Sequence, residues 1–171
     1  MSVSTTIFTA FVDPPVALCP LVPGVVEHLA DLFTSEQLDT AMDRAARASH
    51  ATVAVFAAAP VDCRNEKMLD SGSAAVEFVV EFFVPPSSMD LFHRELESQL
   101  LQSSLQYVDG RYRGEFAACV LHSILAGTFH QYRITCRTSA AEQRQFRWSR
   151  DRILLDGILH QALTGWRELG Q

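Results

Sequence analysis

The chain is 171 residues long and acidic, with a formal net charge of −6 and a sequence pI near 5.4. Hydrophobic residues make up 48% and charged residues 20%, a balance typical of a folded globular protein and not of a disordered one. The acidic total argues against nucleic-acid binding. No apolar run reaches the ~20 residues of a membrane-spanning helix, and one domain is the default at this length.

The N-terminal sequence and the cysteines favour a cytoplasmic location. The first basic residue is Arg44, so the apolar run at 7–12 lacks the basic flank of a signal peptide. The cysteines have no paired spacing and are interpreted as reduced thiols. They are Cys19, Cys63, Cys119 and Cys136.

The basic residues are concentrated in the second half of the chain. Residues 1–100 contain 5 basic and 14 acidic side chains, whereas residues 101–171 contain 9 and 6. Thirteen of the 14 basic residues are arginine. Arginine can bind phosphate or carboxylate through a planar fork, although a GC-rich genome would enrich it equally well.

The first 31 residues are rich in proline and predict an extended leader that contacts a partner, with a short strand at 6–12. A helix over 35–49 follows, because Thr34 and Gln37 form a capping-box pattern ahead of apolar residues at helical spacing. The run 51–59 predicts a strand that ends at Pro60, and 61–73 predicts a loop.

The clearest strand lies around residues 76–82. Val76, Phe78, Val80 and Phe82 alternate with Glu77, Val79 and Glu81, which predicts one core face and one face at least partly in water. Along a strand Glu77 and Glu81 are about 13 Å apart, too far to share a proton. Both are interpreted as solvated or salt-bridged.

Further elements follow Pro85-Pro86. A helix is expected from Ser87 to just before Asp109-Gly110, then a central core strand over 116–125 and an ambiguous segment at 128–138. The last helix is expected to be capped by Ser149 and to carry an apolar stripe. The stripe comprises Leu155, Ile158, Leu159, Ala162, Leu163 and Trp166.

This order of elements predicts an α+β fold. We expect a ferredoxin-like two-layer sandwich with a mostly antiparallel sheet and helices on one face. Residues 32–171 form the single domain and residues 1–31 the leader. A metal site at Cys119 and His122 is not expected, because an odd separation on a strand points the two side chains to opposite faces.

Five stretches follow one another along the chain: Leu32-Phe33-Thr34-Ser35-Glu36-Gln37-Leu38, the strand ending at Glu81, Asp109-Gly110-Arg111-Tyr112, Gly127-Thr128-Phe129 and Gln145-Phe146-Arg147-Trp148-Ser149-Arg150. In this order they resemble the C-terminal domain of the Gretchen Hagen family, the auxin-responsive acyl acid–amido synthetases. The chain departs from the family pattern at several positions. Arg147 replaces the tail lysine, Ser149 replaces a proline, and Ala75-Val76 replaces a His-Tyr pair.

The resemblance implies site residues and a reaction. Family members activate a carboxylic acid with ATP and pass the acyl group to an amine in a cleft between two domains. Arg147 would be the catalytic residue, with Glu81, Gln145 and Arg150 binding substrate or nucleotide. Arginine stays protonated, so Arg147 would stabilise phosphate electrostatically and not act as a base.

The sequence contains neither a Gly-x-Gly-x-x-Gly nor a Walker motif. We therefore expect a stand-alone small domain that closes on a separate adenylating subunit. It would bind no cofactor or metal alone, and ATP and Mg are implied only with the partner. One alternative is a non-catalytic interaction or scaffold module, which could be homodimeric; another is an independent small-molecule enzyme or ligand binder.

Overall fold

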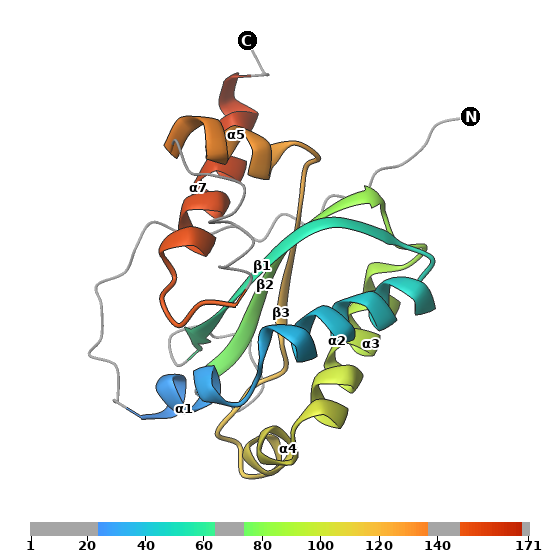
Figure 1. Cartoon of the computed structure of the whole chain (residues 1–171), viewed down its shortest axis with the longest axis vertical. Helices are drawn as coiled ribbons and strands as arrows, with labels where there is room; N and C mark the ends of the chain where they lie inside the picture. Colours follow the sequence, from blue (N-terminus) through green and yellow to red (C-terminus); the bar gives the residue numbers. More distant parts are fainter. Residues whose placement is uncertain (1–23, 64–73, 137–147, 169–171) are drawn as a thin grey trace.

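The structure is a computed structural model, and it describes residues 24–63, 74–136 and 148–168 (Figure 1). The expected strand at 6–12 and most of the expected loop at 61–73 lie outside the described residues. The first helices and strands are α1 (Val25–Asp31), α2 (Ser35–Ala48), β1 (Thr52–Asp62) and β2 (Ala74–Val84). They are followed by α3 (Met89–Ser103), α4 (Leu105–Tyr112), β3 (Val120–Ile124), α5 (Thr128–Cys136) and α7 (Ile153–Glu168).

The described strands form one sheet in the order β1-β2-β3. β1 and β2 pair antiparallel along their whole length, from Thr52 opposite Val84 to Asp62 opposite Ala74. β3 pairs parallel to β2 over a shorter stretch, from Val120 opposite Glu77 to Ile124 opposite Glu81. The predicted α+β class and mostly antiparallel sheet are confirmed, and the sheet with helices α1 to α4 forms the predicted two-layer sandwich.

Two details of the sheet differ from the sequence-based expectation. β3 is an edge strand of the described sheet and only partly buried, whereas the run 116–125 was expected to lie centrally. In addition, β3 is a direct neighbour of β2. In a ferredoxin-like sheet, two parallel strands joined by a helical connection are separated by a third strand. The ferredoxin-like prediction therefore holds for the layers and not for this strand order.

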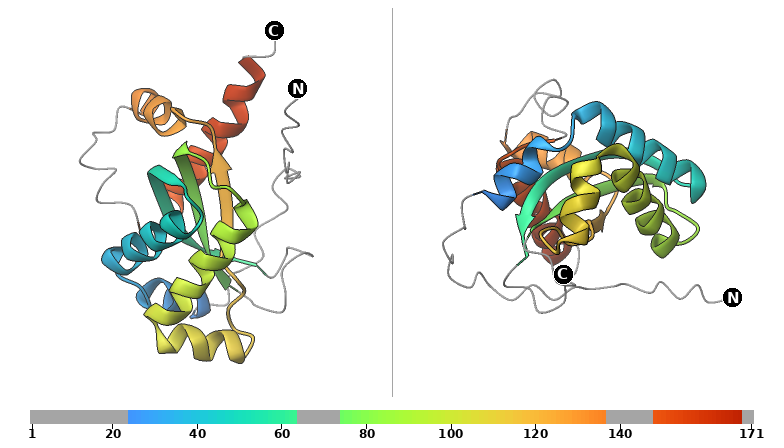
Figure 2. Two further views of the ribbon diagram at one scale, coloured as in Figure 1. Left: turned by 90° about the vertical axis from the view of Figure 1, so that its right-hand side faces the viewer. Right: turned by 90° about the horizontal axis from the view of Figure 1, so that it is seen from below.

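The main core lies between one face of the sheet and helices α1 to α4 (Figure 1 and Figure 2). Val76, Phe78, Val80 and Phe82 point into it, as their alternation predicted. Two aromatic pairs reinforce it: Phe82 packs edge-on against Phe92 of α3, and Phe56 of β1 lies against Phe78.

Helices α5 and α7 lie together on the other side of the strands (Figure 1 and Figure 2). They enclose a second, smaller core with the opposite sheet face, which includes Val79, Phe129, Leu155 and Ile158. Helices α1 to α4 thus form the predicted layer on one face, and α5 and α7 add a second, smaller layer on the other face.

The leader was wrongly predicted to stay extended up to residue 31. Residues 25–31 form α1, whose first turn is closed by the Glu27 carboxylate accepting the Gly24 backbone N–H at 2.7 Å. Leu29 is fully buried in the main core. Helix α1 is thus part of the domain.

The start of α2 agrees with the sequence-based prediction, whereas the end of β1 differs from it. Thr34 and Gln37 form the predicted capping box, with each side chain accepting the backbone N–H of the other. β1 runs past its predicted end, because Pro60 stays in register opposite Val76. An edge strand tolerates proline, whose missing N–H can face away from the ladder.

The helix expected to stop before Asp109-Gly110 is two helices. Ser104 interrupts the run, and its hydroxyl caps α4 by accepting the Tyr107 backbone N–H at 3.2 Å. Gly110 therefore lies inside α4, and a Cβ placed on it would come within 2.2 Å of the Phe116 ring. The glycine lets the chain fold back over α4.

The C-terminal part resolves two open points. Residues 128–136 form helix α5, so the described part of the ambiguous segment at 128–138 is helical. α7 begins at Ile153, and Asp151 accepts the backbone N–H of Ile153 at 3.2 Å. Ser149, the predicted cap, instead donates its backbone N–H to the Ala58 carbonyl at 3.2 Å.

Replacing Gly110 with alanine separates helix propensity from packing. Propensity alone would stabilise α4 by up to ~1 kcal/mol. The clash with Phe116 is expected to outweigh this and lower the free energy of unfolding by about 1–3 kcal/mol. Urea unfolding measures the change, with Gln106→Ala at an exposed position of α4 as the control. A stabilised Gly110→Ala variant would contradict the tight packing.

Candidate functional site

The second face of β2 carries two buried carboxylates. Glu77 and Glu81 are 7% and 8% exposed, although this face was expected to be at least partly wet. The expectation failed because α5 and α7 cover the face. A buried carboxylate requires partners that replace its hydration, and each of the two has a different set.

Glu77 pairs with two cationic or potentially cationic side chains. Its Oε1 lies 2.7 Å from His122 Nε2 of β3, and its Oε2 lies 2.6 Å from Arg152 Nη1. Arg152 also binds Asp156 at 2.8 Å and donates to the Pro60 carbonyl at 3.3 Å. The salt-bridged interpretation of Glu77 is confirmed, and the network connects three strands to the start of α7.

The network shifts the titration of its members. Burial alone would raise the pKa of Glu77, but the His122 hydrogen bond and the Arg152 charge outweigh it and hold the pKa below its ordinary value. Burial likewise disfavours the charged form of Arg152, yet the charges of Glu77 and Asp156 raise its pKa. Glu77 is therefore ionised in the folded protein at neutral pH.

Glu81 closes the start of α5. Its Oε1 accepts the Gly127 backbone N–H at 2.6 Å and its Oε2 accepts that of Phe129 at 3.2 Å. Gly127 has a φ of +91°, a conformation that favours glycine. A carboxylate at a helix N-terminus satisfies free N–H groups and complements the helix dipole. The Gly127-Thr128-Phe129 segment thus donates two backbone N–H groups to a carboxylate of β2.

The described end of the tail motif is anchored to β1 and α1. Trp148 makes a parallel bridge with Ala58 and donates its indole N–H to the Ala30 carbonyl at 3.1 Å. Arg150 forms an ion pair with Asp31, while its side chain stays 72% exposed. The other two predicted tail residues, Gln145 and Arg147, lie outside the described residues.

The predicted site residues are therefore only partly placed. Glu81 is buried against α5 and Arg150 is exposed beside α1, and they share no partner. Arg150 retains donors that an incoming anion can reach. The Glu81 carboxylate has both oxygens occupied by the protein, so its predicted ligand-binding role stays a prediction.

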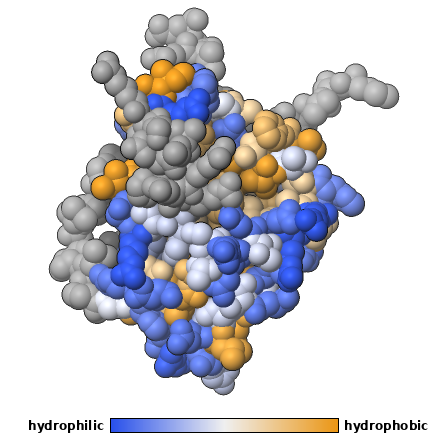
Figure 3. Space-filling view, in the orientation of Figure 1, coloured by the Kyte–Doolittle hydropathy of each residue, from blue (hydrophilic) through white to orange (hydrophobic). Residues whose placement is uncertain are grey.

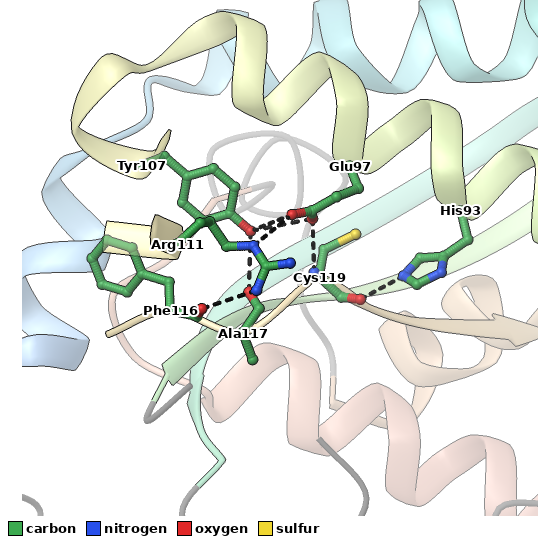
Figure 4. Close-up of polar contacts among 7 residues, drawn as sticks. All are labelled: His93, Glu97, Tyr107, Arg111, Phe116, Ala117 and Cys119. Atoms are coloured by element: carbon green, nitrogen blue, oxygen red, sulfur yellow. Dashed lines mark hydrogen bonds and ion pairs between the residues drawn. The ribbon is translucent and has the colours of Figure 1, made fainter. Parts of the chain in front are cut away.

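A second polar network, on the main-core side, was missed by the sequence analysis (Figure 4). The Glu97 carboxylate of α3 accepts the Tyr107 hydroxyl at 3.2 Å and the Cys119 backbone N–H at 2.9 Å, and pairs with Arg111 Nε at 3.1 Å. Burial raises the pKa of Tyr107 and of the Cys119 thiol, so both stay neutral. The available signal was a glutamate on the inner side of an amphipathic helix.

This network explains part of the Asp109-Gly110-Arg111-Tyr112 motif. Arg111 donates to the Phe116 carbonyl at 3.0 Å as well as pairing with Glu97, and His93 contacts the Cys119 carbonyl oxygen. These bonds hold the segment that leads into β3 (Figure 4). The network thus fixes the backbone of this segment. The side chains of Tyr107 and Cys119 within it are buried.

The sequence matches the model of the GH3 family C-terminal domain over residues 36–150. The chain belongs to the GH3 family. The match runs from α2 to the tail and includes the whole network around Glu97, together with Glu77 and His122 of the other network but not Arg152 or Asp156. The chain matches none of the curated proteins with which it was compared.

The described part of this GH3 domain shows no grouping of three or more His, Cys, Asp or Glu residues that could hold a metal ion. Cys119 belongs to the main core, whereas His122 reaches Glu77 on the other face, as the strand geometry predicted. Within the same residues, no helix is long and apolar enough to cross a membrane.

Glu77→Gln is expected to reduce stability in a pH-dependent way. The variant leaves Arg152 and His122 without their buried anion, which costs roughly 3 kcal/mol at neutral pH. Because the folded pKa of Glu77 is below its ordinary 4.5, the ion pairs stabilise the protein fully above that pH. Their contribution is lost as the pH falls through the lowered pKa.

The stability difference between wild type and Glu77→Gln should therefore be constant near neutrality and shrink at acidic pH. Urea unfolding between about pH 3 and 7 measures it. Glu36→Gln, at an exposed position of α2, is the control and should change stability by less than ~1 kcal/mol. A difference that widens on acidification would contradict the assignment of Glu77.

Proposed function

We propose that this chain is the small domain of an ATP-dependent acyl acid–amido synthetase and acts with a large adenylating domain on a separate polypeptide. The single observation that carries the proposal is the match of residues 36–150 to the GH3 family C-terminal domain. The implied reaction activates a carboxylic acid as its acyl-adenylate and then transfers the acyl group to an amine. A cytoplasmic location is part of the same proposal.

The division of labour follows from the residues of the chain. The sequence contains no glycine-rich phosphate-binding motif, so the partner would bind ATP and Mg. This chain would contribute arginine, which stabilises the negative charge that develops on phosphate oxygens. Arg150, beside α1, is an exposed arginine with that capacity, and Arg147 is the proposed catalytic residue.

The anchoring of the tail supports this role for Arg150. The Trp148 indole is bound to Ala30, and its ring packs edge-on against Phe33. An arginine that follows such an anchor is held near one place and loses less entropy on binding than a free one. The ion pair with Asp31 is exposed, so an incoming phosphate can compete for the guanidinium at low cost.

A scaffold module is the second candidate, and exposed apolar side chains favour it. Phe83 is 75% and Val84 50% exposed at the end of β2, which is unusual for neighbouring large apolar residues. The space-filling view shows apolar surface on this side of the molecule (Figure 3). This hypothesis expects a stable complex or homodimer by light scattering, with no gain in turnover.

The synthetase proposal is tested with proteins captured from the native cell on the tagged chain. ATP–pyrophosphate exchange and amide formation are measured with the captured large subunit, with and without added chain. The chain is expected to raise both rates. Arg147→Ala and Arg150→Ala should each remove most of that gain, roughly tenfold or more, as expected for a lost phosphate-stabilising donor.

Arg47→Ala is the matched control, because Arg47 is an exposed arginine whose ion pair with Asp43 lies within α2. It should leave both rates unchanged. If neither rate responds to the added chain, or if Arg147→Ala behaves like the control, the proposed synthetase role is wrong. A stable complex without any gain in rate would instead support the scaffold module.

A further inference from the structure

The two cores of the domain differ greatly in size. Within the described residues the main core contains twenty-one buried residues, whereas the second core contains six. On the sheet side the buried members of the second core are Ala57, Ala59 and Val79, and Val55 and Ile124 pack against it while partly buried. Small side chains give α5 and α7 little apolar surface to bind, so this layer is held less firmly than the other.

Helices α5 and α7 also leave large apolar side chains in water. Ile134 of α5 and Ile153 and Leu163 of α7 are all at least 60% exposed. Leu163 was expected in the buried stripe of the last helix, whereas Leu155 and Ile158 are the stripe members buried in the second core and Leu159 packs against it. Phe129, Leu155 and Ile158 are thus the fully enclosed part of the apolar attachment, and the other helix residues that contact this core are only partly buried.

Between themselves, the two helices are in close contact. A Cβ on Gly157 of α7 would come within 2.6 Å of the Tyr132 ring of α5, so any larger residue there would require the end of the Tyr132 side chain to shift. Helices packed this closely move together more easily than apart. They form one unit.

The remaining attachment to the sheet is polar. Arg152, directly before α7, binds Glu77, and backbone N–H groups at the start of α5 bind Glu81. His122 of β3 also contacts Glu77, and Asp156 of α7 pairs with Arg152. When such contacts open, carboxylate and guanidinium regain the hydration that burial had removed, which offsets much of the lost attraction.

We propose that α5 and α7 form a lid over the Glu77 and Glu81 face of the sheet, and that this lid opens as one unit while the main core stays folded. Opening exposes both carboxylates of β2 to solvent. The inference does not depend on amide synthesis, since it concerns the chain alone.

Native-state hydrogen exchange of the intact chain tests the lid. Amides of α5 and α7, including the Gly127 and Phe129 amides bound to Glu81, should exchange together. Their protection should be roughly 100-fold lower than that of amides in β2 and α2, with a weaker dependence on denaturant. Exchange of both sets only through global unfolding would overturn the proposal, as would separate opening of α5 and α7.

Two variants identify what holds the lid closed. Arg152→Gln should lower the protection of the α5 and α7 amides by about tenfold and leave those of α2 unchanged. Gly157→Ala should loosen both helices together by forcing them apart at Tyr132. Arg47→Gln, which breaks an exposed pair in α2, should change lid protection less than twofold. Equal losses of protection in both cores would contradict the lid.

Discussion

The burial of β2 on both faces is the constraint on which the rest of the structure depends. It is the central strand of the described sheet, with β1 and β3 on its two sides and a helical layer over each face. Packing alone stabilises its buried apolar residues. Packing does not stabilise Glu77 and Glu81, because a buried carboxylate needs hydrogen bonds and positive charge. The position of α7 over Glu77 and the start of α5 at Glu81 meet that need.

The elements that could be predicted from sequence are those with local causes. The capping box at Thr34 and Gln37 acts within one turn, and the alternation around Phe78 reports which side chains face the main core. The second helical layer could not be predicted in this way. An alternating glutamate on a strand has the same sequence pattern whether water or a distant arginine satisfies it. Arg152 is 75 positions from Glu77 in the chain, so no local pattern connects them.

The candidate site shows the same limit. Resemblance to the family selected Glu81, and the structure adds that both of its oxygens bind the start of α5. Gly110 and Arg111 belong to one of the motifs that carry the family resemblance, and the resemblance implies no role for either residue. The described contacts give each a structural reason, the first in packing against Phe116 and the second in pairing with Glu97. A motif can thus combine residues that maintain the fold with residues that act on a ligand, and only contacts separate the two.

The choice of carboxylates at two positions of β2 has an energetic consequence. A leucine at either position would stabilise the closed layer by apolar burial and would resist exposure to water. A glutamate gives up hydration on closing and recovers it on opening, so the two states differ less in free energy. On the other face of the strand, the main core is held by aromatic and aliphatic contacts. Exposing these side chains to water recovers no favourable hydration. The two faces of one strand therefore favour different behaviour: a permanent core on the side of α2 and α3, and a reversible contact on the side of α5 and α7.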